Sequence, residues 1–423
     1  MEALSAVERL QGLVGLALVL GLAWAASERR RDFPHWRFVA IALALQLLLA
    51  VVVIRVPALW EVLGWANRGV DALAHATRVG SGYMFGFLGG GEAPFVLREG
   101  AARPVAIAFE ILPLVIVTSA LAALLWHWGL LRAIVRGLSW LTQRTLGVGG
   151  AVGLNAGANV FLGVVEAPLV VRAYLARMSR AELFTVMTLG MATVSGVVLV
   201  LYAQTLAGVV EDAFGHLVVA SLISLPAALL LARILVPEGA AAARTPDDGD
   251  DLRYDGSIDA LVRGTLDGLQ LFLAIIAVLI VVFALVTLVD AGLAHAPPVA
   301  GAPLTVGRIF GFAFAPLMWA IGVPWAEAGT AGALMGTKAV LNEYVAYQQL
   351  AALPDGSLGE RAELITVYAT CGFANFASIG LLVSTIGTLA PTRRAEAAAL
   401  GLKSWLAGNL ATLMTGAIVG LVA

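Results

Sequence analysis

Charged residues are scarce in this chain of 423 residues: only 13% are Asp, Glu, Lys or Arg, whereas 60% are hydrophobic. A soluble protein carries about 25% charged residues, so this composition excludes one or two ordinary globular domains. A basic excess is also lacking, because 26 basic residues stand against 28 acidic ones, and this excludes the electrostatic footprint of a nucleic-acid-binding protein. The single cysteine, Cys371, excludes an internal disulfide and any CxxC metal or redox motif. The remaining class is a polytopic α-helical membrane protein, in which each helix satisfies its own backbone polar groups.

Long uncharged apolar runs, by contrast, are abundant. Crossing the hydrocarbon core of a bilayer takes about 20 apolar residues, within a range of about 17–25. Runs of that order predict eight transmembrane helices, at residues 10–26, 38–54, 111–126, 183–210, 217–232, 268–289, 364–392 and 404–423. Residues 57–100 carry Trp60 and Trp65 in an amphipathic pattern, which predicts an interfacial helix and loop on the outer face.

Two further apolar stretches contain helix breakers. Residues 145–165 hold six glycines and two asparagines and run directly into Glu166. Residues 309–326 hold Pro316 and Pro324, and the segment that follows ends in another acid, Glu343. Broken segments at membrane depth are tolerated only where they are buried in protein or line a cavity. Interrupted segments in corresponding halves of a chain also point to the binding site of a transporter. Both stretches are therefore predicted to be re-entrant hairpins.

A short motif recurs about 180 residues later in the chain. Residues 180–186 read RAELFTV and residues 361–367 read RAELITV, and each copy opens a long span. The spans are predicted to break at residues 190–193 and 372–375, and a hairpin with one glutamate precedes each. Such a short match can arise by chance in a chain rich in Ala and Leu, but the shared order favours an inverted repeat. The predicted fold class is an all-α polytopic membrane protein with eight transmembrane helices, two re-entrant hairpins, interfacial helices and an inverted repeat.

The two hairpin glutamates need a reason for their position. A charge at the bilayer centre costs about 2.5–3.5 kcal/mol on insertion scales. One interpretation is that each acid is buried and satisfied by backbone N–H groups or by Lys338. The functional interpretation is that Glu166 and Glu343 face each other across a midplane cavity and accept hydrogen bonds from a polyhydroxylated solute. Asn375 and Ser378 lie on one face after the second break and either supply polar groups to the same cavity or only cap a helix.

Unwound helices also provide oxygen atoms for a cation, because their carbonyl groups lose their usual donors. Asn159 and the carbonyls near Leu162 lie in the first hairpin, and Thr193 and Val194 lie in the first broken span. Together they predict an oxygen cage for Na⁺, a hard ion. Alternatively, Asn159 merely caps a half-helix.

At these residues the sequence resembles the concentrative nucleoside transporters, specifically their bacterial branch. The matching segments include NVFLGVVEAPLVVRAYL at 159–175, MSRAELFTVMTLGMATVSG at 178–196, PLMWAIGVPW at 316–325, GTKAVLNEYVAYQQL at 336–350, and CGFANFASIG through LAPTRR at 371–394. The resemblance covers roughly residues 80–423. It implies a homotrimer that lies in a lipid bilayer and imports nucleosides, driven by Na⁺ or, in some members, by H⁺.

The resemblance also implies roles for individual positions. It assigns Glu343, Asn375 and Ser378 to the sugar, with Phe373 lining the pocket. It assigns the base side to Glu166, Val164, Val165 and Val198, and the Na⁺ site to Asn159, Leu162, Thr193 and Val194. The family's first hairpin commonly reads Gly-Gln-Thr-Glu or Gly-Gln-Ser-Glu, whereas this chain has valine at 164 and 165. Two valines can pack against a base but cannot pair with its edge. We therefore expect base discrimination to be broadened or shifted, for example toward purines, while sugar recognition is kept.

A division of the chain follows from this resemblance. Residues 1–126 would hold scaffold spans 1–3 and the outer interfacial helix, and residues 127–236 the first repeat, with an interfacial helix, hairpin 1 and spans 4 and 5. Residues 237–300 would hold a cytoplasmic linker and scaffold span 6, and residues 301–423 the second repeat, with an interfacial helix, hairpin 2 and spans 7 and 8. Most of the 26 basic residues fall in inner loops if the N-terminus is outside. This predicts a multi-pass protein of the cell inner (plasma) membrane with both termini on the outer side.

The predicted function is Na⁺-coupled nucleoside import by an elevator-like movement of the hairpin domain, with no catalytic residue and no nucleic-acid partner. Three alternatives stay open. The coupling ion could be H⁺, carried by a carboxyl group such as that of Glu166. The chain could be an intramembrane enzyme that uses Glu166 and Glu343 as an acid/base pair, although an enzyme has no need of inverted symmetry. It could also be a passive channel.

Overall fold

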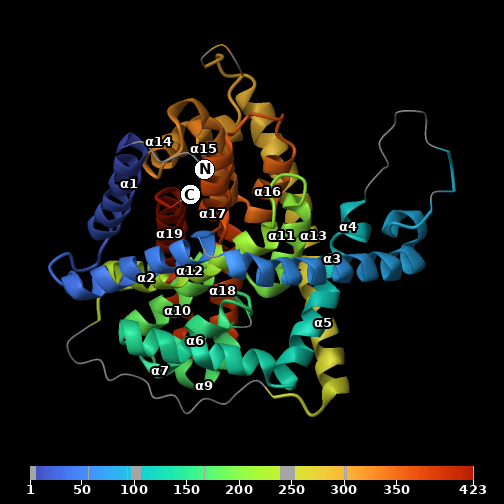
Figure 1. The fold of residues 1–423 in the computed structure, drawn as a ribbon, viewed down its shortest axis with the longest axis horizontal. Coiled ribbons are helices and arrows are strands. Elements are labelled where there is room, and N and C mark those ends of the chain that lie inside the picture. Colours follow the sequence, from blue (N-terminus) through green and yellow to red (C-terminus); the bar gives the residue numbers. More distant parts are fainter. Residues whose placement is uncertain are drawn as a thin grey trace.

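The computed structural model describes residues 6–55, 57–92, 94–96, 106–165, 167–238, 253–299, 301 and 303–422. Glu166 and residues 239–252 of the predicted linker lie outside these ranges. The elements described are all helices (Figure 1), which confirms the all-α fold class. Each of the eight predicted spans coincides with a helix or with a pair of helices. By length and apolarity alone, four helices of the described residues can cross a membrane, or five if one bent pair is counted as a span.

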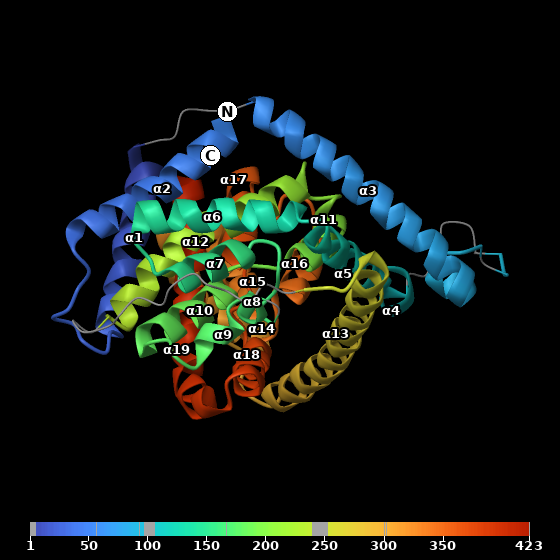
Figure 2. The ribbon, with the colours of Figure 1, turned by 90° about the horizontal axis from the view of Figure 1, so that it is seen from below.

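The chain begins with three long helices and a short turn of 3₁₀ helix: α1 (Ala6–Ala25), α2 (Trp36–Arg55), α3 (Pro57–Phe85) and η1 (Gly86–Gly89). Helix α3 runs along the outside of the molecule, as Figures 1 and 2 show, so a helix does form in the predicted interfacial segment. Gly12 in α1 lies against Leu421, because a Cβ atom on this glycine would be 2.7 Å from the leucine side chain. The first helix therefore packs against the end of the described chain.

A pair of tightly packed helices forms one flank, away from α1 and α2 (Figures 1 and 2). They are α5 (Pro113–His127), preceded by the short α4 (Ile107–Glu110), and α13 (Ser257–Leu293). At Gly268 of α13 an added Cβ would lie 2.8 Å from Ile116 Cα and from Ser119 Cβ, so the close approach of the helices requires glycine there. Farther along α13, the apolar side chains of Ile280 and Leu288 are exposed.

The remaining helices repeat one order of elements. The first set is α6 (Leu130–Leu146), α7 (Gly150–Ala158), α8 (Ala167–Val170), α9 (Arg172–Leu175), α10 (Arg180–Ala192), α11 (Gly196–Leu206) and α12 (Ala213–Leu235). The second set is α14 (Val306–Ala320), α15 (Trp325–Val340), α16 (Glu343–Ala351), α17 (Glu360–Thr370), α18 (Phe376–Leu389), η2 (Pro391–Arg393) and α19 (Arg394–Gly420). In each set an outer helix, a hairpin, a broken span and a closing helix follow one another.

The second hairpin begins later than its apolar stretch indicates. Pro316 stays inside α14, and the chain turns at Gly322, whose φ of +120° is in the left-handed region. Helices α14 and α15 meet there at 119°. The arms around the predicted acid are therefore α15 and α16, and Glu343 is the first residue of α16.

The first broken span is interrupted three residues later than predicted. Helix α10 continues through Gly190 to Ala192, and α11 begins at Gly196, so the break is at residues 193–195. The prediction of a break starting at Gly190 is wrong because this glycine serves helix packing. A Cβ atom there would lie 3.1 Å from Val164 Cγ2 in the first hairpin. The second break falls at residues 371–375, which agrees with the prediction.

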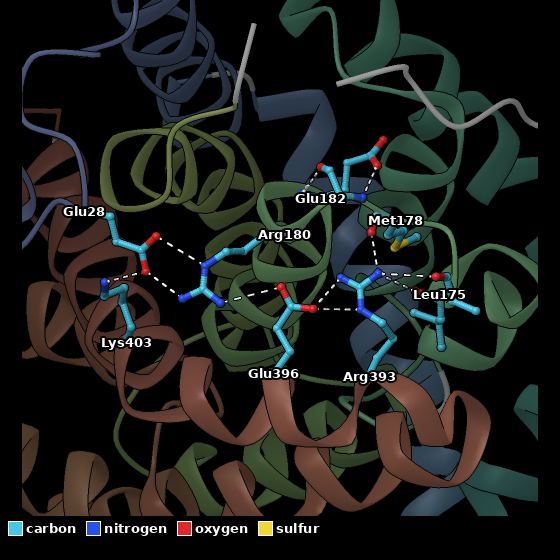
Figure 3. Close-up of polar contacts among 10 residues, drawn as sticks. Glu28, Leu175, Met178, Arg180, Glu182, Arg393, Glu396 and Lys403 are labelled. Atoms are coloured by element: carbon cyan, nitrogen blue, oxygen red, sulfur yellow. Dashed lines mark hydrogen bonds and ion pairs between the residues drawn. The ribbon is translucent and has the colours of Figure 1, made fainter. Parts of the chain in front are cut away.

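The two RAEL motifs start helices and anchor them. Ser179 and Glu182 form a reciprocal capping box at the start of α10. Arg180 lies 2.8 Å from Glu28 and 3.5 Å from Glu396, and Lys403 also lies 2.9 Å from Glu28. Figure 3 shows this ionic network, which joins the loop after α1 to the starts of α10 and α19. In the second copy Arg361 instead donates to backbone carbonyls, those of Gly322 and Gly420.

Candidate functional site

The two helix breaks meet in the interior of the molecule. The backbone N–H of Phe373 donates to the carbonyl of Thr193 at 3.2 Å. A Cβ atom on Gly372 would lie 3.0 Å from the carbonyl oxygen of Ala192, so the two unwound segments are in van der Waals contact. Backbone N–H and C=O groups that leave a helix need other hydrogen-bond partners. Here an N–H group of the second break bonds to a carbonyl group of the first.

A cavity of about 110 Å³ opens beside this crossing. Its lining includes all the described residues that were predicted to bind substrate, namely Val164, Val165, Val198, Glu343, Phe373, Asn375 and Ser378. One wall comes from α13, through Leu271, Ala274 and Ile275. The cavity therefore lies between the two hairpin repeats and the flank formed by α5 and α13.

Glu343 is the buried acid of this cavity, with only 3% of its surface exposed. The Tyr202 hydroxyl donates to its Oε1 at 2.5 Å, and the Asn375 side-chain amide donates to its Oε2 at 3.1 Å. Lys338 donates elsewhere, to Asn409 at 2.9 Å and to Thr412 at 3.1 Å. The interpretation that Lys338 pairs directly with this acid is therefore wrong. The carboxylate is oriented by neutral donors, which leaves lone pairs for further hydrogen bonds.

Three helices begin at the cavity, and this determines its electrostatics. Ser195, Asn342 and Asn375 are the N-cap residues of α11, α16 and α18, and all three line the cavity. The side chain of Asn375 accepts from the N–H of Ser378 at 2.8 Å, so it both caps a helix and contacts Glu343. The positive ends of three helix dipoles thus point to one place, which favours a carboxylate there and hydrogen-bond acceptors on a ligand.

Another part of the cavity lining is apolar. It is formed by Val164 and Val165 at the tip of the first hairpin and by Val198 and Leu201 on α11. These side chains offer van der Waals contact but no hydrogen bond to a flat ring. The polar wall and the apolar wall match a ligand with a hydroxylated half and an aromatic half.

The predicted cation ligands lie in two segments that touch. The N–H of Gly196, just after the first break, donates to the carbonyl of Phe161 in the first hairpin at 3.0 Å. This contact brings Asn159 and Leu162 near Thr193 and Val194, and all four are buried. The Oδ1 atom of Asn159 has no hydrogen-bond partner among the described residues. An unpaired buried carbonyl oxygen among backbone carbonyls is a donor set that fits a hard cation such as Na⁺.

Tyr202 and Tyr344 line the cavity but were not predicted from the sequence. Tyr202 lies four residues after Val198 on α11, so the two side chains share one face of the helix. The spacing of four residues from Val198 is therefore the sequence signal that could have identified Tyr202 as a lining residue. Tyr344 follows Glu343 directly, and its ring stacks on that of Tyr202 with centroids 6.1 Å apart.

Comparison with known proteins agrees with this geometry. Family models match in three parts: the Na⁺ dependent nucleoside transporter N-terminus at residues 14–88, nucleoside recognition at 108–208, and the Na⁺ dependent nucleoside transporter C-terminus at 216–420. The nucleoside permease NupC of Helicobacter pylori is 31% identical over 414 residues, which cover 97% of this chain and 96% of that protein. The uncharacterized transporter YutK of Bacillus subtilis is 34% identical over 417 residues, covering 97% and 99%.

A solved structure shares the whole fold as well. The inward-facing, substrate-bound structure of CNTnw superposes with a TM-score of 0.86 at 34% identity, covering 98% of this chain and 97% of that one. These relatives are transporters and not enzymes, which removes the intramembrane-enzyme alternative. The sequence, the helix order and the cavity lead to the same conclusion: the chain belongs to the concentrative nucleoside transporter family.

Proposed function

We propose that this chain imports nucleosides together with Na⁺. The observation that carries the proposal is the cavity itself, whose lining combines an oriented carboxylate, that of Glu343, with apolar side chains of the first hairpin and α11. The coupling ion is supported by the buried, unpaired Oδ1 atom of Asn159 close to the same cavity.

In this proposal the ribose lies at the polar wall. Its hydroxyls donate to Glu343 and interact with Asn375 and Ser378, while Phe373 packs beside it. The base lies against Val164, Val165 and Val198; Glu166, which the resemblance assigns to the base side, lies outside the described residues. Because the two hairpin valines cannot hydrogen-bond a base edge, selectivity comes mainly from the sugar. Nucleosides with different bases are then accepted with similar affinity.

Na⁺ would be held by Asn159 and Thr193 together with the carbonyls of Leu162 and Val194. The same break that carries Thr193 accepts the backbone N–H of Phe373. A cation that orders the first break therefore also orders a residue of the nucleoside pocket, which provides a short path for coupling. One Na⁺ contributes about 2.3 kcal/mol per 100 mV, and a tenfold gradient adds about 1.4 kcal/mol. The sum is enough to concentrate a neutral solute several hundredfold.

The transport cycle we propose is a movement of the two repeats against a scaffold. The scaffold would comprise residues 1–126 and span 6 within 237–300, and residues 127–236 and 301–423 would carry ion and nucleoside. Because α13 forms one wall of the cavity, the site lies at the boundary between these two bodies. The assembly would be a homotrimer in the cell inner membrane with both termini outside.

Uptake into proteoliposomes tests the proposal. Purified protein is reconstituted and radiolabelled uridine and adenosine uptake is measured with an inward Na⁺ gradient, with an inward H⁺ gradient in K⁺ buffer, and with neither. We expect accumulation only with Na⁺, and stimulation of labelled uptake by unlabelled nucleoside inside. Accumulation driven by H⁺ without Na⁺ would transfer the coupling role to a proton. Uptake without counterflow would indicate a channel.

A further inference from the structure

The orientation of the Asn159 side chain is determined by one neighbour, Asn155. The Nδ2 atom of Asn159 donates to the backbone carbonyl of Asn155 at 2.8 Å and to its side-chain Oδ1 at 2.8 Å. An asparagine amide has two N–H donors, so both are used on this single residue, one turn earlier on α7. The Oδ1 atom of Asn159 is left without a partner among the described residues.

This orientation follows from chemistry, although the two ends of an amide have nearly the same shape. A backbone carbonyl can only accept, so nitrogen and not oxygen of Asn159 must face the carbonyl of Asn155. The Asn155 side chain must then turn its own oxygen toward that nitrogen, since two amide nitrogens cannot bond to each other. Its Nδ2 atom is consequently also buried without a partner among the described residues. The two amides therefore fix each other.

The free oxygen is directed away from α7 and toward α10. A Cβ atom placed on Gly190 would lie 3.7 Å from Asn159 Oδ1 and 3.1 Å from Val164 Cγ2. Gly190 is three residues before Thr193, where the first break begins. The oxygen thus faces the space between the hairpin and the broken span, where the other predicted cation ligands lie.

We infer that Asn155 is a positioning residue for the coupling cation. This inference rests on the proposed Na⁺ coupling and adds to it a residue that does not touch the ion. Asn155 occupies both donors of Asn159, so that only its oxygen is presented to Na⁺. Without the Asn155 side chain, one N–H of Asn159 loses its partner and the amide can rotate toward other groups. Partners that orient a metal ligand in this way typically change metal affinity by about 10–100-fold when removed.

The test is a Na⁺ titration of the purified full-length protein, read as thermal stabilisation at constant ionic strength with K⁺ as the replacement. Asn155→Ala should raise the Na⁺ concentration for half-maximal stabilisation by about 10–100-fold. Its affinity for uridine at saturating Na⁺ should stay within about threefold of the wild-type value. Asn155→Asp keeps an oxygen acceptor for the Asn159 amide and adds a negative charge near the cation, so its Na⁺ midpoint should stay at or below that of the wild type.

Two further variants separate positioning from general damage. Asn159→Ala removes the ligand itself, and adding Asn155→Ala to it should cause no additional loss, because the second residue acts only through the first. Thr188→Ala removes an equally buried polar group on α10, whose hydroxyl donates to the carbonyl of Phe184 in the same helix, and should leave the Na⁺ midpoint unchanged. If Asn155→Ala fails to fold, Asn155→Asp decides the question, because a raised Na⁺ midpoint in a variant that keeps the acceptor oxygen would overturn the positioning role.

The outcomes distinguish the two levels of the proposal. If the wild-type protein shows no stabilisation specific to Na⁺, the proposed coupling fails and the role of Asn155 fails with it. If the wild type responds and Asn155→Ala responds at the same Na⁺ concentration, only the positioning role is overturned. Equal losses in Asn155→Ala and Asn155→Asp would also overturn it, since the retained oxygen would then have no effect.

Discussion

The sugar side and the cation side of the candidate site differ in how completely their polar atoms are bonded. On the sugar side, both oxygens of Glu343 accept hydrogen bonds, and both ends of the Asn375 amide are engaged. On the cation side, the oxygen of Asn159 is buried without a partner among the described residues. The polar side chains of the first region are paired without a ligand, whereas the second region keeps a buried acceptor oxygen that a cation can use, and binding there would order the first break and, through the contact with Phe373, the rest of the pocket. The difference suggests that the ion binds first and the nucleoside then meets a prepared surface.

The largest expected effect is on the sugar side. Glu343→Gln keeps the shape of the side chain but replaces an acceptor oxygen by a donor, and it removes the charge that the ribose hydroxyls would contact. Hydrogen bonds to charged groups contribute about 1.5–3 kcal/mol each, so we expect nucleoside affinity to fall by about 100-fold or more. Titration calorimetry at saturating Na⁺ measures this loss. Glu327→Gln, which alters an acid that accepts from the N–H of Gly359, is the matched control. A loss below threefold would remove Glu343 from the sugar site.

The apolar wall provides the second test. Introducing Val164→Gln together with Val165→Thr restores an amide and a hydroxyl where a base edge would lie. A base whose edge does not match leaves the introduced amide or hydroxyl without a hydrogen-bond partner, and this costs binding energy. We therefore expect discrimination between uridine and adenosine to increase by about 10–100-fold. Competition uptake with the two nucleosides measures the ratio. If the wild-type protein is already strict for uridine, the predicted effect of the valines is wrong.

A smaller effect is expected at Tyr202, which orients Glu343 from the other repeat. Tyr202→Phe removes the hydroxyl that donates to Oε1 and leaves the ring contacts in place. We expect nucleoside affinity to weaken by about tenfold, corresponding to one lost hydrogen bond to a charged group, with an unchanged Na⁺ midpoint. Tyr347→Phe is the control, because that hydroxyl bonds to the backbone carbonyl of Val367. If Tyr202→Phe shifted the Na⁺ midpoint and left nucleoside affinity unchanged, Tyr202 would act on the cation site and not on the sugar site.

The smallest effect concerns the ionic network outside the site. The hydrogen bond from Arg180 and the nearby Lys403 hold the pKa of Glu28 at about 2, below its usual 4.5. A carboxyl whose pKa is lowered by folding adds stability above pH 4.5, and this stability is lost as the pH falls toward about 2. A half-exposed pair of this kind contributes about 0.5–1 kcal/mol, so Glu28→Gln should lower the melting temperature by about 1–2 °C at pH 7.

The pH profile makes that prediction specific. The difference between Glu28→Gln and the wild type should shrink below pH 4.5, because the Glu28 carboxyl of the unfolded chain binds a proton there while that of the folded protein stays ionised down to about pH 2. Asp32→Asn, which breaks an exposed pair with Arg29, is the control and should have no measurable effect at any pH. A difference that persists unchanged at pH 3 would show that the ionised network is not the source of the stability.

Much of the fold could be predicted because its signals are local, and the described substrate positions taken from the two helix breaks and from the family resemblance line one cavity. An uncharged apolar run predicts a membrane helix, and a glycine-rich run that ends in an acid predicts a hairpin. The predicted start of the first break is wrong because a glycine such as Gly190 can have two roles: it can interrupt a helix, or it can let another segment pack closely against the helix. Only the contact with Val164, which the sequence does not show, identifies the second role. Tyr202 was missed for a related reason. Its hydroxyl acquires a role only through Glu343, 141 residues away, and no local pattern contains that contact.

The central claim is that the ion prepares the nucleoside site, and linkage tests it directly. Uridine affinity is measured by calorimetry in Na⁺ and in K⁺, and Na⁺ affinity is measured with and without uridine. The account predicts that Na⁺ strengthens uridine binding by about tenfold or more, that uridine strengthens Na⁺ binding by the same factor, and that Asn159→Ala abolishes both effects. Equal uridine affinity in Na⁺ and in K⁺ would contradict the account.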